Sequence, residues 1–440
     1  MRTLTLKASF KYRFYALFSL LVFLLFLNYV LLIPIPALIF VGVLVLIAFL
    51  GDRNEIISVC ISCIPLYTAI KVHYVLFCCV VIFLFKYGKE VKLDFGVISI
   101  FLIVVWEFLH CFSNETNLKL MITFPFVYLF FIILLFSRDI KSIDYAFVVK
   151  NFAIMVFAVC CILTMRLMVK NDFNIDVAFI DMRRLGLTDK EVGGLIINPN
   201  SLGIQCVLAV GGLIQIRYIG EKKIRYICLM VLILILGALT GSRTYLACLL
   251  ILGVYLLLVS KGGIKAKAKA SVIGIFCVLV SVLLLYLIFP TALETFVQRL
   301  NVEDITSGRN SLFVVYAEYM FSSPKVFLWG LGSLSLDEKI AKLAIAKNVP
   351  HNGIQEICVA WGIPGLIFFA AMIFVLIRRS KQENPHQIGL NYLPLVILFA
   401  KIMVGQVITS SYTMLSFALI YLSLCQDFST NRQTEQIKSK

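Results

Sequence analysis

Long apolar runs recur along the whole sequence and are separated by short polar segments. The runs are 14 to 25 residues long, and an α-helix needs about 20 residues to cross the hydrocarbon core of a membrane. The runs lack the strict alternation of apolar and polar residues that is typical of strands in a transmembrane barrel. We therefore expect about fourteen membrane-spanning helices. They lie near residues 14–33, 35–50, 55–70, 72–85, 93–112, 119–136, 151–169, 193–216, 226–241, 243–259, 270–289, 353–377, 389–409 and 411–425.

The composition supports this interpretation. Of the 440 residues, 61% are hydrophobic and only 15% are charged, which leaves too few polar residues to cover a soluble globule. We predict an all-α fold, a polytopic integral membrane protein in which residues 1–440 form a single transmembrane domain. Residues 170–192 and 290–352 are predicted to be loops on the outer side, and the longer loop should contain short amphipathic helices.

The formal net charge of +16 comes from basic residues that gather in short clusters between the apolar runs, for example in residues 217–225 and 261–269. Lys and Arg are more numerous in the segments on one side, which places those segments and both termini in the cytoplasm. Such clusters hold loops at anionic headgroups. We therefore expect membrane lipids as partners and no nucleic acid.

Thirteen cysteines are present, and nearly all lie inside apolar runs. This placement is typical of small hydrophobic residues rather than of disulfides or metal ligands. His73, Glu107 and His110 lie at or near the ends of predicted helices, where polar tips commonly reach the membrane interface. We expect no functional site at these three positions.

The outer loop 170–192 carries Arg183 and Arg184 among several acids. Mixed charges are typical of a solvated surface, but paired arginines also suit a diphosphate or an anionic sugar. The segment Asn198-Pro199-Asn200 then interrupts an apolar run. Its freed backbone groups require protein or a water-lined cavity, so the helix is either broken against a site or simply kinked.

Arg243 lies in the turn T-G-S-R-T-Y between two apolar runs on the predicted outer side. The turn is too short for this side chain to reach far into water. Arginines are less common on the outer side than on the cytoplasmic side. An ionisable residue at this depth is a functional candidate.

Residues 306–365 form the longest water-compatible stretch of the chain. Helical spacing of three and four residues predicts an amphipathic helix that ends before Pro324. Arg309 should lie at the rim of its apolar face, unless the helix simply lies on the membrane surface. The face comprises Leu312, Phe313, Tyr316 and Met320. The following W-G-L-G at 329–332 indicates a tight backbone turn or a close approach to another segment.

His351 and Asn352 stand immediately before the predicted helix 353–377. Asn352 is a suitable N-cap, and a helix N-terminus favours an anion. The same dipole disfavours imidazolium, so His351 should be neutral and able to accept a proton. A purely structural role in the cap is the alternative.

The order of these motifs resembles the O-antigen polymerase and ligase superfamily, the Wzy and WaaL type of integral-membrane glycosyltransferase. The motifs are an early G-S-R, then S-G-R, S-P, G-x-G, H-N-x-x-x-E and G-I-x-G, within about residues 198–369. The resemblance implies a fold similar to GT-C glycosyltransferases in the bacterial inner membrane, with the active site facing the periplasm. It also implies catalytic roles for His351, Arg309 and Arg243. The further candidates for substrate binding are Arg183, Arg184, Asn198, Asn200, Tyr316, Asn352 and Glu356.

The resemblance further implies a donor in which an oligosaccharide is linked to undecaprenyl diphosphate. Arg243 and Arg309 would stabilise the departing diphosphate, and His351 would deprotonate the acceptor hydroxyl, inverting the anomeric carbon. The predicted outer loops contain no D-x-D pattern and no His/carboxylate cluster, although Asp304, Asp337 and Glu338 are present. We therefore predict no metal and no cofactor.

Three functions stay open on the sequence. The motifs favour a polymerase, for which a chain-length regulator is a candidate partner. The first alternative is a ligase that transfers the glycan to lipid A-core. The second is a transporter or flippase for lipid-linked glycans. A transporter should carry charges through several spans, whereas intramembrane charges here are few and Lys401 is the clearest.

Overall fold

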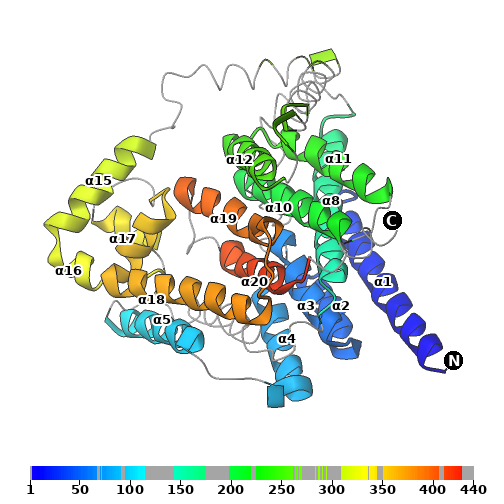
Figure 1. Ribbon diagram of the computed structural model, residues 1–440, viewed down its shortest axis with the longest axis horizontal. Helices are drawn as coiled ribbons and strands as arrows, with labels where there is room; N and C mark the ends of the chain where they lie inside the picture. Colours follow the sequence, from blue (N-terminus) through cyan, green and yellow to red (C-terminus); the bar gives the residue numbers. More distant parts are fainter. Residues whose placement is uncertain are drawn as a thin grey trace. The chain divides into compact units, whose positions relative to one another are not determined.

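The computed structural model describes residues 2–66, 72–90, 95–113, 143–173, 198–219, 224–260, 309–334, 336–343, 350–405 and 411–428, with Ile70 and scattered positions between 263 and 294. These residues form helices and no strand (Figure 1). The predicted all-α class is therefore confirmed.

The chain divides into two compact units. The first contains residues 1–40, 68–70 and 149–305, and the second contains residues 41–67, 71–148 and 306–440. Two of the boundaries between them fall within helices α2 (Ala37–Leu50) and α8 (Tyr145–Lys170).

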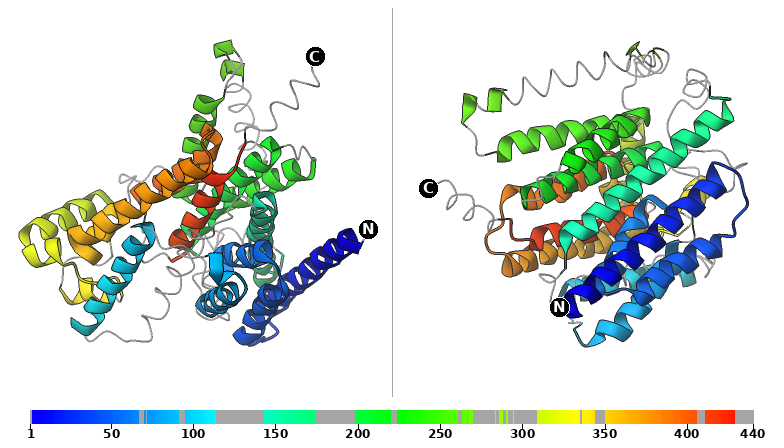
Figure 2. Two further views of the ribbon diagram at one scale, coloured as in Figure 1. Left: turned by 60° about the horizontal axis from the view of Figure 1, so that its bottom comes forward. Right: turned by 90° about the vertical axis from the view of Figure 1, so that its right-hand side faces the viewer.

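In the first unit, α10 lies against two neighbouring helices, α11 and α12, and both figures show the three as one green group (Figures 1 and 2). Gly212 of α10 is in contact with the Val149 side chain of α8, so a larger residue there would separate the helices. Most of α10 is buried, which makes it the centre of this unit. The unit's helices are α1 (Arg2–Tyr29), most of α8, α10 (Pro199–Tyr218), α11 (Ile224–Leu239) and α12 (Arg243–Val259).

In the second unit, the long helix α18 (Gly353–Glu383) contacts α5, α15, α16, α19 and α20. Figure 1 shows α5 running alongside it. The other elements are α3 (Arg53–Ser62), η1 (Ile64–Leu66), α4 (Val72–Tyr87), η2 (Gly88–Glu90), α5 (Phe95–Ser113), α15 (Arg309–Ser322), α16 (Pro324–Leu328), α17 (Leu336–Lys342), η4 (Gly389–Tyr392), α19 (Leu393–Val404) and α20 (Ser411–Cys425).

Four helices among the described residues are long and apolar enough to cross a membrane, within α1, α8, α10 and α18. Seven shorter apolar helices accompany them. The count of fourteen spans stays a prediction, because the predicted helix 119–136 and most of 270–289 lie outside the described residues.

Two of the predicted helices have wrong boundaries, and in both the observed boundary lies near a proline. The predicted span 55–70 is not one helix, since α3 ends at Ser62 and the short 3-10 helix η1 follows. Pro65 explains this end, because a proline ring clashes with the carbonyl four residues earlier. The predicted span 193–216 becomes α10, which begins only at Pro199, with Asn198 in an extended conformation as its N-cap.

The helix α18 is broken near its middle. Gly362 has φ +65°, outside the helical region, and Pro364 follows two residues later. Pro364 has no N–H, so it cannot satisfy the Ala360 carbonyl as an ordinary helical residue would. A backbone acceptor freed at this depth of an apolar helix needs another donor within the protein.

The turn that follows α16 supplies those donors. Gly332 N donates to Ala360 O at 2.7 Å, and Leu331 N donates to Val359 O at 2.9 Å. The approach requires glycine: Gly330 has φ +88°, and a Cβ there would lie 2.7 Å from Gly362 N and collide with the Ala360 carbonyl. The predicted close approach of W-G-L-G to another segment is therefore confirmed, and that segment is the break in α18.

Substitution of Gly330 tests this packing. We expect Gly330→Ala to lower the free energy of unfolding by at least about 2 kcal/mol, because it adds left-handed strain and a backbone collision. The matched control is Gly253→Ala in α12, where a Cβ meets nothing within 4 Å. That variant should be neutral or gain up to about 1 kcal/mol from helix propensity. The test is to measure the thermal unfolding midpoints of both purified variants in detergent. Equal midpoints for the two variants would contradict the proposed packing.

Candidate functional site

In the first unit, the turn between α11 and α12 is built by side-chain hydrogen bonds. Ser242 is the N-cap of α12, and its Oγ accepts from Tyr245 N at 3.2 Å. Thr240 Oγ1 accepts from Ser242 N at 3.3 Å and donates to Gly237 O at 2.6 Å. Gly241 completes the turn with φ +56°. Arg243, half-buried, is therefore fixed as the first residue of α12.

This turn is joined to the start of α10. Ser242 Oγ donates to Asn200 Oδ1 at 2.7 Å. A Cβ on Gly203 would lie 2.7 Å from Tyr245 Cβ, so only glycine allows this approach. The structure thus brings Asn200, and with it the Asn198 cap, beside the turn that carries Arg243. The sequence indicated each of these residues as a site candidate, but it did not indicate that they lie together.

In the second unit, the Glu107 side chain of α5 is almost completely buried and holds the turn that follows α16. Its carboxylate accepts from Ser333 N at 2.9 and 3.0 Å and from Leu334 N at 3.1 Å. Trp361 Nε1 donates to the same carboxylate at 2.6 Å. A buried carboxylate is costly unless hydrogen bonds replace its hydration, and here three N–H groups from two segments do so.

Aromatic residues enclose this carboxylate. Trp106 Nε1 donates to Trp361 O at 3.0 Å and approaches Trp329 O at 3.3 Å. The His110 ring nitrogen Nε2 lies 3.1 Å from the same Trp329 carbonyl. The Trp106 and Trp329 rings are 4.4 Å apart between centroids. Lys339 Nζ donates to Leu331 O at 2.8 Å, which fixes the turn from the side of α17. We call this set, with Glu107, Trp361 and residues 329–334, the tryptophan cluster.

The start of α18 is capped as predicted. Asn352 Oδ1 accepts from Ile354 N at 3.0 Å and Gln355 N at 3.2 Å, which confirms Asn352 as the N-cap. Its Nδ2 donates to Met403 O at 3.2 Å. His351, half-buried, lies immediately before this cap. Glu356, in the first turn of α18, is fully buried.

The helix α15 begins at Arg309 and is fastened to the start of α18, since Gln355 Nε2 donates to Phe313 O at 2.8 Å. Tyr316 and Met320 are buried, but Phe313 is 49% exposed, so the buried face is narrower than predicted. Burial raises the pKa of the Tyr316 hydroxyl above its ordinary value, and Asp337 nearby raises it further. Tyr316 is therefore a neutral part of the packing at neutral pH.

The predicted site residues fall into three groups. Asn198, Asn200 and Arg243 are brought together in the first unit, while Arg309, Tyr316, His351, Asn352 and Glu356 belong to the second. Arg183 and Arg184 lie outside the described residues, and of Arg309 only the backbone is described. The convergence of Arg243 with Arg309 and His351 stays a prediction.

The sequence interpretation missed the role of Glu107 and His110. Both were assigned to the membrane interface, but both are buried and both contact residues 329–334 or their neighbours. Their position in the sequence could have indicated this role. A carboxylate and an imidazole that lie three residues apart inside an apolar run need hydrogen-bond partners within the protein.

Replacement of Glu107 tests the tryptophan cluster. In Glu107→Gln one carboxylate oxygen becomes an NH₂ group facing N–H donors, so we expect a loss of about 1–3 kcal/mol in unfolding free energy. The three tryptophans of the chain all belong to the cluster, so intrinsic fluorescence reports on it directly. Its emission should shift in Glu107→Gln.

The control is Glu318→Gln on the exposed side of α15. This variant should keep the wild-type stability within about 0.5 kcal/mol, with the wild-type emission. If Glu107→Gln behaves in the same way, the carboxylate does not hold the turn.

Comparison with known proteins shows which family the chain resembles. Residues 228–370 match the family model Wzy_C, described as O-antigen ligase. The matched range includes Arg243, Arg309 and His351 together with the turn after α16 and the break in α18. No curated protein matches the chain. The family match confirms that this chain is similar to the O-antigen polymerase and ligase superfamily, in the region that carries its candidate catalytic residues.

Proposed function

We propose that the protein is a polymerase of O-antigen or a related surface polysaccharide. It would join repeat units carried on undecaprenyl diphosphate, at the periplasmic face of the bacterial inner membrane. The observation that carries the proposal is the family match over residues 228–370, which includes the three candidate catalytic residues. The apolar helices support an integral membrane enzyme.

The reaction needs stabilisation of a leaving group. Transfer of the glycan breaks the bond between the anomeric carbon and the diphosphate, and negative charge grows on the departing oxygen. Guanidinium groups held in place by the fold stabilise such charge without rearranging in the reaction. Arg243 suits this role because the Ser242 cap and the Asn200 contact fix its backbone. Arg309 would be the second group, as the first residue of α15.

The acceptor hydroxyl must lose its proton as it attacks. His351 precedes the capped N-terminus of α18, whose dipole favours a neutral imidazole. A neutral imidazole accepts the proton, and direct displacement inverts the anomeric carbon. The protein is proposed to need neither a metal nor a cofactor.

The tryptophan cluster positions this machinery. It fixes the end of α16 against the break in α18, about two to three helical turns beyond the Asn352 cap. The bond from Gln355 to Phe313 ties α15 to the same end of α18. Tyr316 and Glu356 are buried in this region. Glu107 is therefore proposed as a positioning residue for Arg309 and His351, and it does not contact substrate.

The catalytic assignment predicts separable effects. His351→Ala should reduce polymer formation by about 10²–10⁴-fold, as for loss of a general base. Arg243→Ala and Arg309→Ala should each reduce it by about 10²–10³-fold, as for loss of a group that stabilises developing charge. Purified protein is given lipid-linked repeat units, and product length is measured on gels.

Two controls accompany this series. Arg243→Lys keeps the charge but not the planar fork, so it should retain more activity than Arg243→Ala. Arg378→Ala, near the end of α18, removes one positive charge away from the proposed site and should be as active as the wild type. Normal polymer from all three alanine variants, at matched protein level, would end the assignment.

Metal independence is tested with a chelator. Because the arginines take the role that a divalent ion plays in other transferases, activity should persist in excess EDTA. Full inactivation that added Mg²⁺ or Mn²⁺ restores would refute this part of the mechanism.

The two alternatives give different outcomes. A polymerase deletion strain should retain core carrying one repeat unit, whereas loss of both long and single-repeat glycan would identify a ligase acting on lipid A-core. Polymer formation by the purified protein in detergent, where there is no membrane to cross, would exclude a pure transporter. A chain-length regulator would change the product distribution when added to the purified protein.

A further inference from the structure

We propose that a cavity in the first unit, beside the middle of α1 and the N-terminal parts of α8 and α11, binds the phosphate headgroup of an anionic membrane lipid. The cavity has a volume of about 360 Å³. It contains none of the residues proposed for catalysis, so the inference does not depend on the proposed function. Its lining consists of Tyr15, Lys150, Ile154, Arg225, Tyr226 and Leu229.

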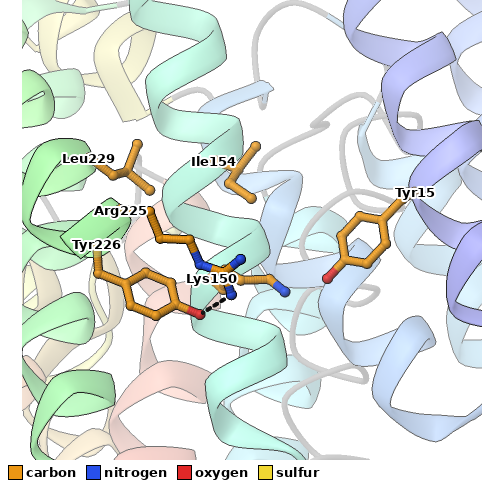
Figure 3. Close-up of a pocket in the computed structure, with 6 residues that line it drawn as sticks. All are labelled: Tyr15, Lys150, Ile154, Arg225, Tyr226 and Leu229. Atoms are coloured by element: carbon orange, nitrogen blue, oxygen red, sulfur yellow. Dashed lines mark hydrogen bonds between the residues drawn. The ribbon is translucent and has the colours of Figure 1, made fainter. Parts of the chain in front are cut away.

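Cations and hydroxyls meet in this cavity. Figure 3 shows the polar tips of Lys150, Arg225, Tyr15 and Tyr226 pointing toward one another from three helices. Arg225 Nη2 donates to the Tyr226 hydroxyl at 3.2 Å. A guanidinium, an ammonium and two phenols together offer several N–H and O–H donors, which match the several acceptor oxygens of a phosphate group.

Aromatic rings hold the two cations in place. Lys150 Nζ lies 4.9 Å from the centroid of the Tyr15 ring, and Arg225 Cζ lies 5.1 Å from that of Tyr226. Such contacts stabilise a cation and restrict its side chain. The two contacts orient the cations, and Arg225 stays exposed to an incoming ligand.

The other part of the lining is apolar. Ile154 follows Lys150 by four residues in α8, and Leu229 follows Arg225 by four residues in α11, so each lies one turn further along its helix. In Figure 3 both apolar side chains lie to one side of the polar tips. This arrangement suits an amphiphile, with its phosphate at the cations and the start of its acyl chains at Ile154 and Leu229.

The position along the helices agrees with this ligand. Arg225 is the second residue of α11, and Lys150 is the sixth residue of α8. The N-terminus of α11 favours an anion. In the predicted topology this end of the helices is cytoplasmic, the side on which anionic lipids attract basic segments. Tyrosines are also enriched at the membrane interface. A soluble phosphate would contact the two cations but would make no contact with Ile154 and Leu229.

The test uses the purified full-length chain in detergent. Its thermal midpoint is measured during titration with phosphatidylglycerol, with phosphatidylcholine as the neutral comparison. A ligand that binds only the folded state raises the midpoint. The double variant Lys150→Gln, Arg225→Gln should need at least about ten times more phosphatidylglycerol for the same rise, because it loses two charge-assisted contacts.

The matched control is Lys325→Gln, Lys342→Gln, which removes two positive charges from exposed positions of the second unit that lie outside the basic clusters 217–225 and 261–269. It should titrate as the wild type does. If both double variants weaken equally, general electrostatic attraction accounts for the effect and the proposal is wrong. It is also wrong if inorganic phosphate stabilises the wild type as phosphatidylglycerol does, or if phosphatidylglycerol has no effect beyond that of phosphatidylcholine.

A second variant keeps the test decisive if the charge variant does not fold. Leu229→Trp fills the apolar side and leaves both cations in place. It should weaken stabilisation by phosphatidylglycerol, while Lys150→Arg, Arg225→Lys should retain it because the cations remain. Unchanged lipid titration in Leu229→Trp would overturn the proposal.

Discussion

The structure around the candidate site depends on how a broken helix satisfies its backbone. Gly362 and Pro364 interrupt α18, and the freed carbonyls accept hydrogen bonds from the turn after α16 and from Trp106. The backbone of that turn donates hydrogen bonds to the Glu107 carboxylate, which holds it in place. The break in α18 is therefore a junction at which main-chain hydrogen bonds join α18 to the turn after α16, and the Glu107 and Trp106 side chains join α5 to both.

This junction bears on how the proposed outer loop would hold the proposed catalytic groups in place. Loops are usually more mobile than the helices they connect. Here α15 is tied to α18 through Gln355, and the segment after α16 is tied to α5 through Glu107. The segments that carry Arg309 and His351 are thus both fastened to α18, which is the kind of positioning that the proposed catalytic roles require.

The sequence was most informative where one residue type has one common use. Asn352 occupies the predicted N-cap, and the G-x-G pattern marks a close approach of backbones. It was least informative about distant partners. Glu107 meets donors 226 and 254 residues further along the chain, and local periodicity contains nothing about such contacts. Pro364 was visible in the sequence, but the position of the break depends on the turn that stabilises it.

The Glu107 contacts also have a consequence for how the protein is made. Membrane helices are synthesised in order, and α5 is complete long before Ser333 and Trp361 leave the ribosome. The N–H groups that surround this carboxylate in the finished protein are therefore absent when α5 is made. During that interval the Glu107 carboxyl group lacks the partners that satisfy it in the folded unit. The hydrogen bonds that join α5 to α18 and to the turn after α16 can form only after the C-terminal part of the chain has been synthesised.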